Sequence, residues 1–99
     1  MPSAEHVRVR EVVDLLDEAR ALTLTYPSAS SPTFGEEYAA WRYREVLYFA
    51  RKADLLARIA AEHENADAHD TARRARAQYE QEVDRLVADT LADLNGGGR

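Results

Sequence analysis

The chain has 99 residues, with 18 acidic and 13 basic side chains, a net charge of −5 and no cysteine. Without cysteine it can form neither a disulfide framework nor a thiolate metal site. The negative charge opposes nonspecific attraction to nucleic-acid phosphates, and no apolar run approaches the ~20 residues that span a bilayer. The length predicts one small domain with a modest core, which a partner subunit often completes.

The first residues, 1–6, lack the charged-then-apolar pattern of a signal peptide. We therefore expect an acidic, soluble protein of the cytoplasm. Proline and glycine divide the chain: the prolines are Pro2, Pro27 and Pro32, and the glycines other than Gly35 lie in the tail. No alternating β-branched run indicates a strand, so the predicted fold class is all-α.

The first helix is predicted over residues 4–24, with Ser3 as its N-cap. One apolar stripe recurs along it at helical spacing and comprises Val12, Leu15, Leu16, Ala19 and Leu22. The helix ends before Pro27, because the residue before a proline disfavours the helical conformation. Residues 25–33 are rich in Ser, Thr and Pro and are predicted to form a loop.

The second helix is predicted over residues 33–63, starting either at Ser31-Pro32 or at the capping box Thr33-x-x-Glu36. It carries two apolar faces. The bulky face comprises Phe34, Tyr38, Trp41, Tyr48, Phe49, Leu55, Leu56 and Ile59. The alanine face comprises Ala39, Tyr43, Val46, Ala50, Ala53, Ala57 and Ala60. An ordinary surface helix has one apolar stripe, so two faces predict a long central helix with two neighbours.

Residues 62–71 contain no large apolar side chain and offer three N-caps, at Asn65, Asp67 and Asp70. Either the chain turns here, or one long helix continues with a solvated middle. We favour the turn, because it lets a third helix fold back onto the second.

The third helix is predicted over residues 70–94, with a single narrow apolar stripe typical of a peripheral helix or a coiled coil. Asn95-Gly96 is predicted to end it, and residues 96–99 are predicted to be a disordered Gly-rich tail. Residues 1–95 then form a single all-α domain, either a three-helix bundle or a helical hairpin with an added N-terminal helix.

Ligand-type side chains gather in one stretch, residues 62–70. On a continuous helix His63 and Asp67 would share a face, a spacing that can bind a metal. The Glu-x-x-His and His-Glu-x-x-His patterns are missing. We interpret the stretch as a solvated turn, and a metal-dependent enzyme built on His63 and His69 is the third function hypothesis. No catalytic, cofactor-binding or metal-binding residue is assigned.

Two charged side chains, Glu45 and Lys52, lie two turns apart within the bulky face. A buried carboxylate would be a candidate site. The simpler interpretation is an edge position, where the stem covers the core and the head reaches water or a salt-bridge partner on another helix. One acid without a second acid, a histidine in register or a nucleophile makes no mechanism, so we favour the edge positions.

The strongest basic run is Arg73, Arg74 and Arg76. These side chains could contact phosphates, and a nucleic-acid-associated accessory protein is therefore the alternative function. Acidic residues follow within three turns, however, so that pairing along a solvated helix face is the favoured interpretation.

The function we expect is protein–protein interaction, as a small adaptor, regulator or structural subunit without catalytic activity or cofactor. Six of the eight aromatic residues lie between Phe34 and Phe49, and such a stripe is typical of a core or an interface. The second helix has more apolar surface than a lone three-helix domain needs, which predicts a homodimer. The predicted interface comprises Tyr38, Trp41, Tyr48, Phe49, Leu55 and Ile59.

Overall fold

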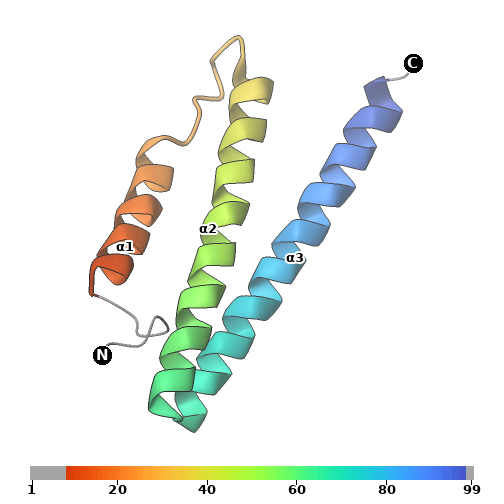
Figure 1. Cartoon of the computed structure of the whole chain (residues 1–99). Helices are drawn as coiled ribbons and strands as arrows, with labels where there is room; N and C mark the ends of the chain where they lie inside the picture. Colours follow the sequence, from red (N-terminus) through yellow and green to blue (C-terminus); the bar gives the residue numbers. More distant parts are fainter. Residues whose placement is uncertain (1–8, 98–99) are drawn as a thin grey trace.

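A computed structural model of the chain describes residues 9–97 and consists there of three helices without a strand (Figure 1). Helix α1 spans Val9–Leu24, α2 spans Phe34–His63 and α3 spans Ala66–Gly97. The predicted all-α class with three helices is confirmed. In this part of the chain, no helix combines the length and the apolar character needed to cross a membrane.

Helix α2 is the element against which both other helices pack. Within the described residues, α1 and α3 each contact α2 but not each other. Both run antiparallel to α2, and α3 diverges from α2 toward its own C-terminus (Figure 1). The molecule measures 57 × 25 × 22 Å. Its radius of gyration is 16.8 Å, against about 13 Å for a compact chain of 100 residues, so the bundle is elongated.

Helix α2 begins at Phe34, with Thr33 in the N-cap position. The predicted capping box does not form: the Thr33 side chain makes no cap hydrogen bond, and its Oγ1 lies 3.3 Å from Oγ of Ser31. The N–H of Phe34 donates to the carbonyl of Ser31 at 3.1 Å. The start near residue 33 thus comes from a turn in the preceding loop, with Pro32 in that turn and not in the first helical position.

The chain reverses direction at Glu64 and Asn65. Glu64 has a left-handed conformation, with φ 48° and ψ 40°, and its N–H donates to the carbonyl of Ala60 at 2.9 Å. Oδ1 of Asn65 accepts hydrogen bonds from the N–H groups of Asp67 at 2.7 Å and Ala68 at 3.3 Å. One residue therefore ends α2 and the next caps α3.

For residues 62–71 the structure has the turn, the alternative that we favoured. Helix α3 begins earlier than the predicted residue 70, because Asn65 is its N-cap. At its other end α3 continues through residues 95–96, predicted as a stop, and ends at Gly97. The predicted helical residues 4–8, with the cap at Ser3, and the last two residues of the tail lie outside the described residues.

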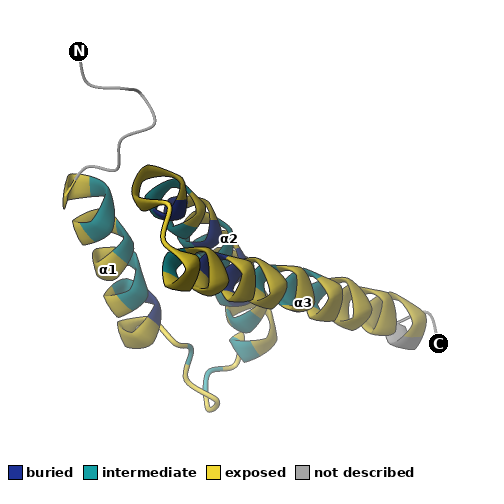
Figure 2. Cartoon of the chain, turned by 90° about the horizontal axis from the view of Figure 1, so that it is seen from below, coloured by how far each residue is buried: buried dark blue, intermediate teal, exposed yellow. Residues whose placement is uncertain are grey.

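The buried apolar side chains are small and few. They are Leu22, Val46, Ala53, Leu55, Ala60, Ala72 and Ala75. Two alanines on α2 and two on α3 let these helices approach closely near the turn. Farther from the turn α3 carries the larger side chains of Tyr79, Glu82 and Leu86 on its partly buried side, and there the two helices separate. Figure 2 shows that most of the C-terminal half of α3 is exposed.

The alanine face of α2 is only partly buried. Ala53 and Ala60 are buried, Ala50 is half-buried, and Ala39 and Ala57 are exposed. Burial repeats every seven residues along Val46, Ala53 and Ala60, so the other alanines fall at the edge of the contact. The expectation that Ala57 packs against a neighbouring helix is therefore wrong.

We predict that Ala53→Leu lowers the free energy of unfolding by about 1–3 kcal/mol, because the added side chain overpacks a close helix contact. Ala57→Leu is the matched control, one turn away and exposed, and is expected to change stability by less than about 0.5 kcal/mol. Urea unfolding followed by circular dichroism measures both. Equal stability of the two variants would contradict the packing described for α2.

We also predict that Glu64→Gly raises the free energy of unfolding by roughly 0.5–1 kcal/mol, because glycine adopts the left-handed conformation without steric conflict. The control Ala61→Gly replaces an exposed residue inside α2 and should lower stability by about 1 kcal/mol. Thermal unfolding measures whether each substitution raises or lowers stability. Destabilisation by both substitutions would contradict the assignment of Glu64 as the cap.

Candidate interaction surfaces

Two of the predicted interface residues, Tyr38 and Trp41, belong to an aromatic cluster with Tyr26 of the preceding loop. The ring centroids of Tyr26 and Trp41 are 4.9 Å apart, edge to face, and those of Tyr38 and Trp41 are 6.1 Å apart and stacked. Nε1 of Trp41 donates to the carbonyl of Leu22 at 2.8 Å. This carbonyl lies in the last turn of α1 and has no partner within its helix. The cluster thus fastens the end of α1 to α2.

The other four predicted interface residues follow along α2. Tyr48 and Phe49 are half-buried, with ring centroids 5.6 Å apart, and Ile59 is also half-buried. Leu55 is only 5% exposed and, together with Leu15 of α1, lines a shallow pocket between α1 and α2. Leu55 therefore contributes to packing within the chain and leaves almost no surface for a partner.

Ion pairs join the inner side of α1 to α2. Nη2 of Arg44 donates to Glu18 at 3.0 Å, and Nη2 of Arg58 donates to Glu11 at 2.8 Å. The hydrogen bond to Glu11 raises the pKa of Arg58 above its ordinary value. Partly exposed pairs of this kind contribute about 1 kcal/mol or less. They do, however, turn these two carboxylates of α1 toward α2.

One charged side chain lies in the core: Arg42 is 8% exposed. Its Nη1 donates to Glu45, one turn further along α2, at 2.6 Å, and its Nη2 donates to Glu82 of α3. Burial lowers the pKa of Arg42, but the hydrogen bonds to Glu82 and Glu45 outweigh this effect and raise the pKa above its ordinary value. The stabilisation from a raised arginine pKa is lost only above about pH 12, so Arg42 stays charged at any ordinary pH.

The contacts of this ion cluster distinguish between the two interpretations of Glu45. Its carboxylate is partly exposed and has a salt-bridge partner, as the edge interpretation requires, but the partner is Arg42 of the same helix. Lys52 is half-buried. Arg42 was not singled out from the sequence, and its burial was missed. The available signal was its spacing, because Arg42, Val46, Ala53 and Ala60 share one heptad pattern.

We predict that Arg42→Met lowers the free energy of unfolding by about 3 kcal/mol, because the Glu82 side chain, only 12% exposed, loses its close partner and retains only the longer ion pair to exposed Arg85 at 3.6 Å. The double variant Arg42→Met/Glu82→Leu should recover most of this loss, since the buried charges are then replaced by apolar groups. Arg73→Met, an exposed pair, should change stability by less than about 0.5 kcal/mol. If Arg42→Met is as stable as Arg73→Met in urea titrations, the network does not stabilise the fold.

The basic run on α3 is paired along its own helix. Arg73 donates to Asp70, the Arg74 guanidinium lies 4.0 Å from Asp70, and Nε of Arg76 donates to Glu80 at 3.4 Å. All three arginine side chains are exposed. Intrahelical pairing on a solvated face is thus observed, but only Arg76 pairs with one of the acidic residues that follow the run. Arg73 and Arg74 pair with Asp70, which precedes it.

His63 and His69 lie on either side of the turn and are both exposed. His63 is in the last turn of α2 and His69 is in the first turns of α3. His63 and Asp67 do not share a helix, so the spacing considered for metal binding is not realised. Within residues 9–97, no three His, Cys, Asp or Glu side chains form a group that could hold a metal ion.

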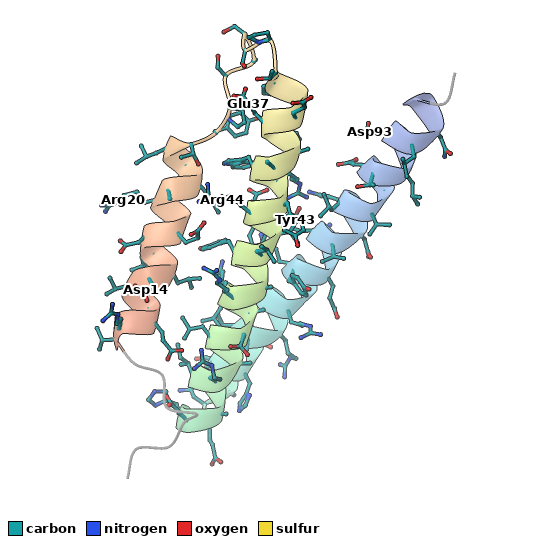
Figure 3. All side chains as sticks on the ribbon, turned by 45° about the horizontal axis from the view of Figure 1, so that its top comes forward. Asp14, Arg20, Glu37, Tyr43, Arg44 and Asp93 are labelled. Atoms are coloured by element: carbon teal, nitrogen blue, oxygen red, sulfur yellow. The ribbon has the colours of Figure 1, made fainter. Side chains whose placement is uncertain are left out.

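A cleft of about 450 Å³ opens between α2 and α3 at the end far from the turn. It is lined by Ala39 and Tyr43 of α2 and by Leu86, Val87, Thr90 and Leu91 of α3. Figure 3 shows Tyr43 on the side of α2 that faces α3. Tyr43, Val87 and Leu91 are 58%, 51% and 55% exposed. The sequence did not indicate this cleft, because it depends on the divergence of α3.

A second apolar surface lies on the outer face of α1. Val9, Val13, Leu16 and Leu24 are all exposed and recur at helical spacing. Leu15 and Leu22, by contrast, lie toward α2. Leu16, predicted as part of one stripe with them, thus belongs to the opposite, solvent-facing side. We call this surface the outer stripe of α1.

Comparison with known protein families, with curated proteins and with solved structures finds no match to this chain. We therefore base its function on the surfaces described above.

Proposed function

We propose that this chain is a small, cytoplasmic protein–protein interaction module, an adaptor, regulator or structural subunit that acts without catalysis. The observation that carries the proposal is the imbalance between core and surface. Among the described residues, three large apolar side chains are buried, whereas ten are at least 44% exposed. A partner that covers such side chains gains about 25 cal/mol for each Å² of apolar surface removed from water.

The shape of the molecule supports the same proposal. The accessible surface of the chain is 7535 Å² for a mass of 11.1 kDa, whereas a compact monomer of this mass exposes about 5,700 Å². The chain therefore exposes about a third more surface than a compact fold. Much of the apolar part gathers on two surfaces, the cleft and the outer stripe of α1, and contiguous exposed apolar patches are typical of interaction sites.

A second copy of the chain is the partner that we propose first. A domain of this size buries too little of its own apolar surface to be strongly stable alone. Of the interface residues expected on α2, Tyr38, Tyr48, Phe49 and Ile59 are half-buried and so retain some surface that a partner could cover. Leu55 and Trp41 act within the chain, so we expect the exposed apolar surfaces to carry most of the contact.

The two other functions have less support from the arrangement of their residues. Each arginine of the basic run already has a carboxylate partner on α3, and the chain carries a net charge of −5, which opposes binding to nucleic-acid phosphates. His63 and His69 are exposed and separated by the turn, so the geometry does not favour a metal-dependent enzyme.

We predict that light scattering at micromolar concentration gives a mass of about twice 11.1 kDa. The association should weaken on dilution, because a reversible dimer dissociates by mass action as its concentration falls. A monomer that unfolds cooperatively would contradict the proposed homodimer. A salt-dependent mobility shift with DNA or RNA would instead favour the nucleic-acid alternative.

A further inference from the structure

We infer that copies of this chain associate through two unlike surfaces, with the outer stripe of α1 from one copy seated in the cleft between α2 and α3 of the other. The inference rests on the proposed self-association and names the two surfaces that make the contact. In the homodimer the contact occurs twice, related by a two-fold axis.

The shapes of the two surfaces are complementary. Val9, Val13 and Leu16 lie at positions i, i+4 and i+7, the spacing with which an amphipathic helix enters an apolar groove. The cleft offers such a groove, because α2 and α3 diverge and leave apolar side chains, Tyr43 and Leu91 among them, on its two walls. A helix seated there packs against two helices at once, which covers its apolar ridge on both sides.

The charges of α1 are sorted between its two faces. Glu11 and Glu18 are paired with Arg58 and Arg44 of α2 on the inner side. The outer side retains exposed Arg10, Asp17 and Arg20, and Figure 3 shows Arg20 on the side of α1 away from α2. Asp14 is also exposed, but it lines the pocket between α1 and α2. Among the described residues, the positions one helical turn from the outer stripe therefore carry two arginines and one aspartate.

The cleft has a rim of the opposite charge. The exposed charged residues one helical turn from its lining side chains are Glu36 on α2 and Asp84, Asp89 and Asp93 on α3. Arg42, the basic residue among these positions, is buried and held by Glu45 and Glu82. The last turn of α3 contains no basic side chain that would offset the negative end of the helix dipole. The rim thus attracts the arginines that flank the outer stripe.

Contacts between two like surfaces are disfavoured by the same charges. Two clefts facing each other would bring the carboxylates of one rim against those of the other. Two outer stripes would bring Arg10 and Arg20 of one copy toward those of its partner. Like charges across an interface oppose association, so the unlike pairing is the one in which both the apolar and the charged groups are complementary.

The experiment uses two variants, Leu16→Glu in the outer stripe and Leu91→Glu in the cleft. The replaced side chains are 62% and 55% exposed, so the fold should be retained, and circular dichroism verifies this. Each variant alone should associate with a Kd raised about tenfold or more, because a central apolar contact is lost. Ala61→Glu, an exposed position beside the turn, is the control and should associate like the wild type.

The deciding measurement is a 1:1 mixture of the two variants in light scattering. The Leu91→Glu copy retains an intact outer stripe and the Leu16→Glu copy retains an intact cleft, so the mixture should form a heterodimer through one contact. If one variant alone dimerises as tightly as the wild type, the contact joins two like surfaces and the inference is wrong, although self-association stands. A monomeric mixture, or unchanged association of both variants, also overturns it. A monomeric wild type would overturn the proposed homodimer itself.

Discussion

The buried ion cluster of Arg42, Glu45 and Glu82 sets the relation between the two long helices. It lies farther from the turn than the buried alanines of α2 and α3. A buried cation and carboxylate tolerate few alternative geometries, because each charge must keep its partner. The cluster therefore fixes the register of α3 on α2. Beyond the alanine contact near the turn, α3 diverges from α2 toward its own C-terminus (Figure 1).

This separation produces the surface on which the proposed function depends. Side chains that would be buried in a parallel-sided bundle, such as Leu91 and Tyr43, remain exposed beside the cleft. The alanine end near the turn needs no partner, since the four buried alanines there complete their contact within the chain. A single chain thus combines a closed end, which stabilises the fold, with an open end, which leaves apolar area for a partner.

The helices, the two-sided contact of α2 and the turn could be predicted from the sequence, because each depends on local patterns of apolar residues and caps. Three features depend on tertiary geometry and could not. The heptad spacing of Arg42 with the buried residues of α2 indicates which way it points, but only the position of Glu82 makes the burial of its charged side chain favourable. Leu15 and Leu16 both fit an apolar stripe along the first helix, and only the placement of α2 decides which of them faces solvent. The cleft follows from the divergence of α3, which no local pattern encodes.

Self-association of an acidic chain must overcome the repulsion between two copies that each carry a net charge of −5. The repulsion is smallest where the few outward-facing arginines of one copy meet the carboxylates of the other. Because α2 draws Glu11 and Glu18 inward through Arg58 and Arg44, the outer face of α1 is left as such a positive region. The ion pairs that hold α1 against α2 therefore also keep two carboxylates away from the outer stripe, which in the proposed contact lies against the acidic rim of the cleft. Packing within one chain and the proposed contact between two chains thus depend on the same division of charge.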